Sequence, residues 1–136
     1  MAAVSSRTFR KIVIGSAVYD LVVSSPYSNP WTFDLARAQL SAVNQRLGGA
    51  ALPEFGPFHV LFACMLGSLS LLWSVLRLRD PLPKYGRYDG VGRVLFSTWM
   101  AWTLVTTGAP VLWLSLVPEL TWAVLQWLPV APAPPG

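Results

Sequence analysis

Three long stretches without a charged side chain constrain this chain more than any other feature. The 22 residues between Glu54 and Arg77, the 25 between Arg93 and Glu119, and the 17 after Glu119 contain no Asp, Glu, Lys or Arg. Because a helix rises about 1.5 Å per residue, roughly 20 such residues cross the ~30 Å hydrocarbon core of a bilayer. The stretches therefore predict helices that span a membrane.

Composition supports a lipid environment for much of the chain. Charged residues make up 12% of the sequence and hydrophobic residues 54%, whereas an ordinary soluble domain carries about 25% charged residues. A soluble domain of this size has to cover its remaining surface with polar groups, and this chain has too few of them. The composition argues against a soluble enzyme, a disordered tail and a disulfide scaffold.

Several function classes are disfavoured by the residue types present. The net charge of +4 comes from basic residues that mostly flank apolar runs, which is typical of membrane orientation rather than nucleic-acid binding. Cys64 is the single cysteine and His59 the single histidine, so the chain has no internal disulfide, Cys-based metal cluster or bis-histidine haem site of its own. We predict no cofactor, no metal site and no catalytic residue, and a non-enzyme is favoured.

The predicted fold is an all-α integral membrane protein, an up-and-down four-helix transmembrane bundle that forms one membrane domain over residues 1–136. Gly108 and Pro110 supply the turn between the last two spans, because Gly ends helices and Pro begins them. The expected spans are 12–25 (with a possible extension to 31), 57–76, 91–107 and 110–128, with an amphipathic interfacial helix at 32–47 and a Pro-rich tail at 129–136.

Two alternatives stay open. In a three-span arrangement, one helix runs from Val94 to Val117, the chain turns at Pro118, and the last segment is a terminal interfacial helix. The first span also fits a cleaved signal peptide, because basic residues precede a short apolar run. Asp20 within that run and Pro26 just after it favour an uncleaved helix.

Charge asymmetry predicts the orientation of the bundle. With four spans, the segment before the first helix and the segment between the second and third lie on one side, which is cytoplasmic by the positive-inside rule. Both termini are then cytoplasmic, and the expected location is a bacterial inner membrane. The two segments hold eight of the ten basic residues: Arg7, Arg10, Lys11, Arg77, Arg79, Lys84, Arg87 and Arg93.

Each expected span carries one face of small and polar residues, which indicates where the helices meet. The most regular face belongs to the second span, where Ala63 and Gly67 permit close backbone approach. Its members are His59, Ala63, Gly67, Ser70, Ser74 and Arg77. The repetition of such faces favours a bundle with a partly polar seam.

Asp20 and Glu119 are the candidate intramembrane polar site. Each lies about nine residues from one end of its span, which places it roughly 13 Å deep. An ionised carboxylate at that depth costs about 2.5 kcal/mol or more, so we expect a neutral carboxyl or a shared proton or cation. The structural interpretation is a protonated carboxyl bonded to Ser16 or Ser115; the functional one is a proton or cation relay.

Four further residues are candidate interfacial or partner contacts. His59 is expected near the outer end of its span, and Arg77, Arg87 and Arg93 near the cytoplasmic face. The segment 77–93 is interpreted as a basic, aromatic loop that contacts anionic lipid headgroups.

The leading functional hypothesis is a small polytopic protein that assembles or supports a membrane complex and performs no chemistry. Its partners would be the lipid bilayer and either another protein or further copies of the chain. The alternative is an oligomeric transporter of a proton, a cation or a small solute that uses the two deep acids. An intramembrane enzyme acting on a lipid or a quinone ranks third.

Overall fold

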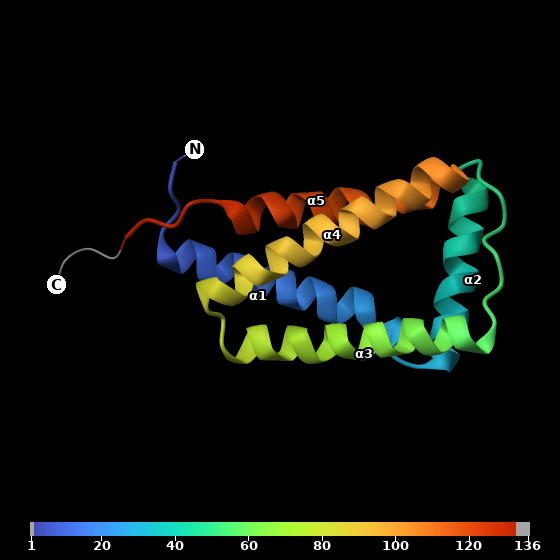
Figure 1. Ribbon diagram of the computed structural model, residues 1–136, viewed down its shortest axis with the longest axis horizontal. Coiled ribbons are helices and arrows are strands. Elements are labelled where there is room, and N and C mark those ends of the chain that lie inside the picture. Colours follow the sequence, from blue (N-terminus) through green and yellow to red (C-terminus); the bar gives the residue numbers. More distant parts are fainter. Residues whose placement is uncertain (1, 133–136) are drawn as a thin grey trace.

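Helices dominate the computed structural model, which describes residues 2–132 (Figure 1). The described part contains five α-helices and two short 3-10 segments, and one isolated bridge between Val4 and Val130. In chain order they are α1 (Ser6–Ser24), η1 (Ser25–Tyr27), α2 (Pro30–Arg46), α3 (Pro57–Arg79), α4 (Pro83–Thr107), η2 (Pro110–Leu112) and α5 (Trp113–Trp127).

Local sequence signals account for most helix ends. The side chains of Ser5 and Asn29 accept hydrogen bonds from the first turns of α1 and α2 and so cap them. Pro57 and Pro83 occupy the first positions of α3 and α4, where the missing proline N–H costs no hydrogen bond. Gly108 ends α4 with φ +65°, a left-handed conformation that glycine adopts without strain.

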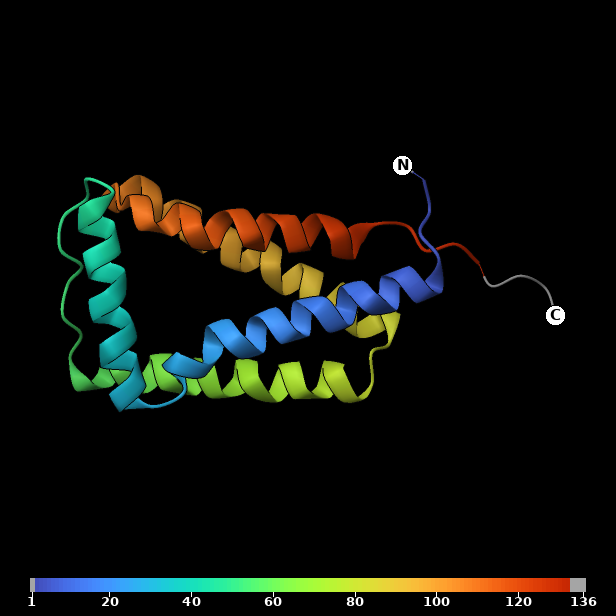
Figure 2. The same cartoon turned by 180° about the vertical axis from the view of Figure 1, so that it is seen from behind.

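Four helices run along the long axis of the molecule, and α2 lies across one end (Figures 1 and 2). The N-terminal segment, the α3–α4 turn and the C-terminal end of α5 all lie at the opposite end. The backbone N–H of Val4 donates to Pro129 O at 2.8 Å there, so the two terminal segments are joined. The four helices along the long axis therefore alternate in direction (Figure 1).

One described helix is long and apolar enough to cross a membrane. This helix is α3, with 23 residues and a mean hydropathy of 1.8 over its most apolar window. α5 has only 15 residues, and α4 contains Arg93 within its apolar part. The all-helical prediction is confirmed, and length and composition alone identify one candidate span rather than four.

At two glycines, the absence of a side chain lets neighbouring segments of the bundle pack closely. A Cβ on Gly67 of α3 would overlap the backbone carbonyl of Tyr27 in η1, with 2.6 Å to the carbonyl carbon. A Cβ on Gly86 of α4 would lie 2.7 Å from Val13 and 3.0 Å from Phe9, which are fully buried on α1. The small-residue face predicted around Gly67 therefore does bring two segments into backbone contact.

Two predicted segments differ clearly from the structure. α1 begins at Ser6 rather than residue 12 and ends at Ser24, so it does not extend to residue 31. α4 begins at Pro83 rather than residue 91, so the interpretation of 77–93 as a loop is wrong and only 80–82 lie between α3 and α4. Both differences arise because charged side chains were taken as ends of helices. Of the predicted Pro-rich tail, residues 133–136 lie outside the described residues.

Candidate functional site

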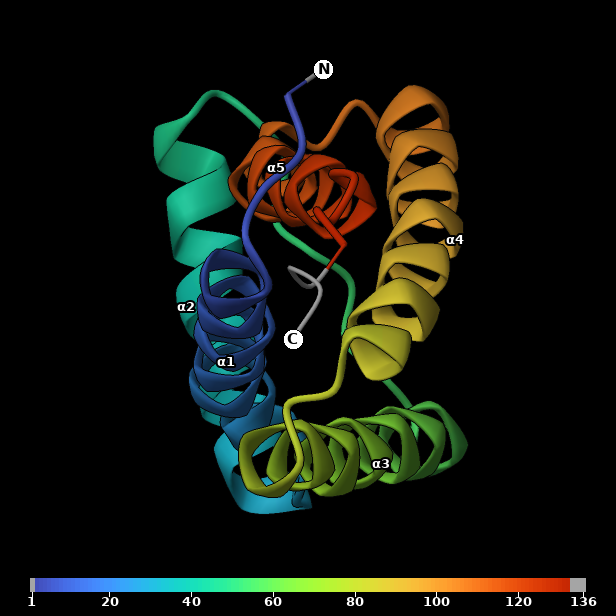
Figure 3. The same ribbon diagram turned by 90° about the vertical axis from the view of Figure 1, so that its left-hand side faces the viewer.

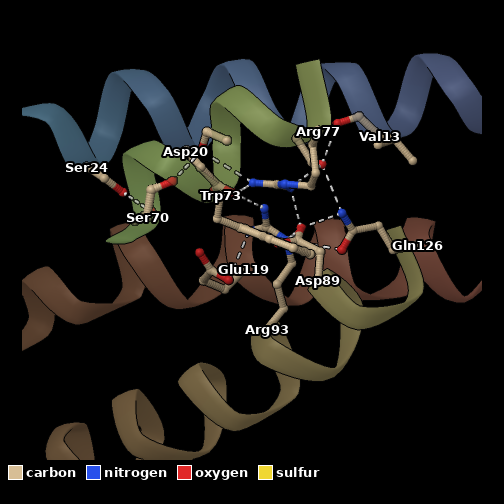
Figure 4. Close-up of polar contacts among 12 residues, drawn as sticks. Val13, Asp20, Ser24, Ser70, Trp73, Arg77, Asp89, Arg93, Glu119 and Gln126 are labelled. Carbon is tan, nitrogen blue, oxygen red and sulfur yellow. Dashed lines mark hydrogen bonds and ion pairs between the residues drawn. The ribbon is translucent and has the colours of Figure 1, made fainter. Parts of the chain in front are cut away.

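Five charged side chains from four helices meet inside the bundle (Figure 4). They come from α1, α3, α4 and α5, and none of these side chains is more than 14% exposed. We call this group the charge cluster: Asp20, Arg77, Asp89, Arg93 and Glu119.

Arg93 is the centre of the charge cluster. Its Nη1 donates to Oε2 of Glu119 at 3.0 Å, and its Nη2 donates to Oδ2 of Asp20 at 2.7 Å. Its Nε donates to Oδ2 of Asp89, one helical turn earlier, at 3.1 Å. One planar guanidinium therefore joins α1, α4 and α5, a use for which its fixed fork of donors is suited.

Arg77 connects α3 to the charge cluster. Its Nη2 lies 2.5 Å from Oδ2 of Asp20, and its Nη1 lies 2.6 Å from Oδ2 of Asp89 and 3.0 Å from Oγ of Ser16. Its side chain is completely buried, and its guanidinium carbon lies 5.6 Å from the centre of the Trp73 ring. The same two aspartates are therefore shared by both arginines.

Neutral side chains add hydrogen bonds to the charge cluster. Gln126 donates through Nε2 to Oδ2 of Asp89 at 2.6 Å and to Oγ of Ser16 at 2.9 Å. The indole N–H of Trp73 donates to Oδ1 of Asp89 at 2.8 Å. Asp89 is thus the most heavily hydrogen-bonded acid of the cluster.

The balance of charge leaves an excess of acceptors. Three carboxylates face two guanidinium groups, so the charge cluster carries a formal charge of −1 when all five groups are ionised. Oδ1 of Asp20 and Oε1 of Glu119 receive no hydrogen bond from any described residue, because the arginines bind the other oxygen of each. Two carboxylate oxygens therefore remain free to accept.

The structure brings Asp20 and Glu119 into one cluster, but it links them through Arg93 rather than through a shared proton. Ser16 lies next to the charge cluster, and its hydroxyl oxygen accepts from Arg77 and Gln126 rather than bonding to Asp20. Ser115 is half-buried and has no hydrogen bond to Glu119 in the described part of the chain.

The predicted interfacial contacts divide into two groups. Arg77 and Arg93 are buried, so they do not contact headgroups as predicted. Arg87 donates to the carbonyl oxygens of Gln126 and Leu128 at 2.7 and 2.8 Å and so caps the C-terminus of α5. His59 is exposed on the first turn of α3, with its ring centre 6.0 Å from that of Phe55 and far along α3 from the charge cluster.

Sequence reasoning missed three contributors to this site. Asp89 lies four residues before Arg93, and an acid and a base at this spacing on one helix were the available signal. Gln126 lies seven residues after Glu119, two helical turns along the same predicted span, but nothing in the sequence marked it as buried. Trp73 gave no signal, since its indole donor becomes relevant only when α3 and α4 lie together.

A groove of about 710 Å³ lies beside the charge cluster, between α3 and α4. Asp20, Asp89, Arg93 and Glu119 line its inner end, and most of its remaining wall is apolar. Tyr27 lines it from η1, and burial raises the pKa of the Tyr27 phenol above its ordinary value, so this hydroxyl stays protonated.

Within residues 2–132, no three His, Cys, Asp or Glu side chains are grouped so that they could hold a metal ion. The site offers two carboxylate oxygens that accept no hydrogen bond from described residues, next to an apolar groove. Comparison of the chain with protein-family models, curated protein sequences and solved structures finds no match to any of them.

Proposed function

We propose that the chain is a polytopic membrane protein that supports or assembles a membrane complex. Four helical segments would cross the bilayer, with α2 at the opposite interface from the termini. α1, α3 and α4 have 19, 23 and 25 residues, which correspond to about 28 to 37 Å of helix. η2 has 3 residues and α5 has 15, which together make about 27 Å if wholly α-helical.

The direction of the charged side chains supports this arrangement. Asp20, Arg93 and Glu119 lower the hydropathy of their helices, yet they point into the bundle and bind each other. The outward side chains of the same helices are large and apolar, such as Val105 at 87% and Trp102 at 63% exposure. Lipid is the solvent that such a surface fits, because polar groups gather inside a membrane bundle.

Most basic residues other than the buried Arg77 and Arg93 lie at one end of the molecule. Arg7, Arg10, Lys11, Arg79, Lys84 and Arg87 all belong to the end of the molecule that holds both terminal segments (Figure 1). The positive-inside rule would place this end in the cytoplasm, as in a bacterial inner membrane.

The supporting role rests on one observation: the acids and arginines of the charge cluster form ion pairs with one another. Each arginine bridges two or three acids, and together they tie α1, α3, α4 and α5 into one unit. Acids held in this way are poor proton carriers, since releasing them breaks a buried ion pair at a cost of about 3–5 kcal/mol. The arrangement favours a rigid scaffold over a proton relay.

The outward face of α2 is the surface that we assign to a protein partner. Trp31 is 82% exposed and Leu35, one turn later, is 60% exposed, whereas Phe33 and Asn44 face the bundle. α2 lies across the end of the four long helices (Figure 2), so its outward face would meet headgroups and water rather than hydrocarbon. Apolar side chains at such a place fit a partner.

Affinity purification from mild detergent tests this function. We expect a stoichiometric protein partner that is lost with Trp31→Ala and retained with Trp102→Ala, a matched control because Trp102 is an exposed tryptophan on a lipid-facing helix. Recovery of the unmodified chain alone would refute the supporting role.

Transport of a proton or cation is the second candidate, and the free oxygens of Asp20 and Glu119 favour it. Asp20→Asn and Glu119→Gln would then abolish flux in liposomes. Undiminished flux in both variants would exclude this role.

A further inference from the structure

The groove beside the charge cluster is open because α4 diverges from α3. The two helices are close at their connecting turn, and α4 then crosses toward the far end of the molecule while α3 stays below it (Figures 1 and 3). The groove between them is walled by apolar side chains of both helices, including Leu66, Leu69, Phe96 and Met100. It is a wedge with a polar inner end.

The outer side of the groove faces the surroundings of the bundle. Leu69, Tyr88 and Trp99 line it and are 63%, 70% and 62% exposed. In the membrane arrangement proposed above, this opening would lie against lipid, so an apolar molecule could enter from the bilayer without crossing water. Its volume is within the roughly 300–1,000 Å³ typical of small-molecule sites.

The inner end of the groove offers acceptors. Arg93 donates three of its five N–H groups to the three acids, and the indole N–H of Trp73 donates to Asp89. Glu119 is 9% exposed overall, lines the groove, and has Oε1 free of hydrogen bonds from described residues. Oδ1 of Asp20 is free in the same sense. A head group that donates is favoured there, because these two oxygens accept no hydrogen bond from described residues and the charge cluster carries an excess of negative charge.

We propose that this groove binds a lipid-like amphiphile with a protonated amine head and an apolar tail. An ammonium group supplies three donors, which is enough for the free oxygens of both Asp20 and Glu119, and it offsets the formal charge of −1 in the charge cluster. Charge-assisted hydrogen bonds of this kind are the strong ones. The tail would lie against Leu66, Leu69, Phe96 and Met100.

Other head groups fit the inner end less well. A carboxylate or phosphate would bring a second negative charge to a site that already has an excess of one. An alcohol could donate one hydrogen bond without offsetting that charge. The proposal rests on the membrane arrangement proposed above, but it is independent of the role in supporting a complex.

Photo-crosslinking in phosphatidylcholine nanodiscs tests the proposal with the full chain. The probes are an alkyl amine, an alcohol and a carboxylate with the same tail and a diazirine at the tail end. We expect saturable labelling by the amine within 63–73 and 96–100, at a concentration about tenfold lower than for the alcohol. The carboxylate is expected to give no saturable labelling.

Gly92 provides a variant that blocks the groove without disturbing the fold. It lines the groove, and a Cβ added there would meet nothing within 4 Å. Gly92→Leu therefore fills the space with a residue that helices favour over glycine, and it should abolish saturable labelling by the amine. Thr106→Leu, at an exposed position of α4 outside the groove, should leave that labelling unchanged.

Glu119→Gln tests the head group separately from the tail. It removes one charge and should raise the half-saturating amine concentration about tenfold while changing that of the alcohol little. Equal saturation by all three probes would overturn the amine assignment. Labelling spread evenly over lipid-facing helices, or unchanged by Gly92→Leu, would overturn the site, as would crosslinks between two copies in place of probe labelling.

Discussion

Arg77 and Arg79 offer a matched pair for measuring what the charge cluster contributes to stability. Both are arginines in the last turn of α3, but Arg77 is completely buried among acids and Arg79 is exposed. Replacing each with Met keeps a long apolar stem and removes the guanidinium. The two variants therefore differ in what surrounds the side chain and little else.

The expected magnitude follows from the contacts of Arg77. Its removal breaks ion pairs of 2.5 and 2.6 Å to Asp20 and Asp89 and takes the formal charge of the charge cluster from −1 to −2. Removing one partner of a buried pair costs about 3–5 kcal/mol. Because Arg93 still binds both aspartates, we expect Arg77→Met to lower the free energy of unfolding by about 3 kcal/mol. Arg79→Met should lower it by less than about 0.5 kcal/mol.

Unfolding by SDS from mild-detergent micelles, followed by tryptophan fluorescence, measures both variants. Adding Asp20→Asn to Arg77→Met restores the formal charge of the charge cluster to −1. The loss of unfolding free energy in the double variant should therefore be smaller than the sum of the two single losses, by at least about 1 kcal/mol. Equal losses for Arg77→Met and Arg79→Met, or strictly additive losses in the double variant, would refute the claim that the cluster holds the bundle together.

Three other expectations can be measured on the same preparations. Gly67→Ala should destabilise by about 1–3 kcal/mol because its methyl group overlaps the Tyr27 carbonyl, and an SDS midpoint equal to the unmodified chain would contradict this. Asn44→Ala should cost about 1–3 kcal/mol, since the buried Val111 N–H that donates to Asn44 loses its acceptor; amide exchange at Val111 should then be faster. Reporter fusions at Gly49 and Gly108 should report the outer side, and fusions at Pro81 and the C-terminus the cytoplasm; Gly108 on the cytoplasmic side would refute four spans.

The helical class and several helix ends were predictable because local signals determine them. The apolar stretch after Glu54 predicted the helix that became α3, and Gly108 with Pro110 predicted the turn before α5. The stripe around Gly67 predicted a face of close contact, which the overlap with Tyr27 bears out. Each of these depends on residues a few positions apart in the chain.

The charged residues could not be placed from sequence in the same way. Charge was taken to mark the ends of spans, and this failed for Arg77, Asp89 and Arg93, which lie within helices and inside the bundle. A lone arginine in an apolar helix is costly, and the cost disappears only when partners from other helices supply the opposite charge.

Sequence alone determined that this chain is helical, that few of its residues are charged, and that eight of its ten basic residues lie in two segments of the chain. These properties follow from composition and short-range periodicity. Only the tertiary structure decided that two arginines and three acids bind one another, because their partners lie up to 73 residues apart. The same packing decided that α4 diverges from α3 and leaves an apolar groove ending at two free carboxylate oxygens.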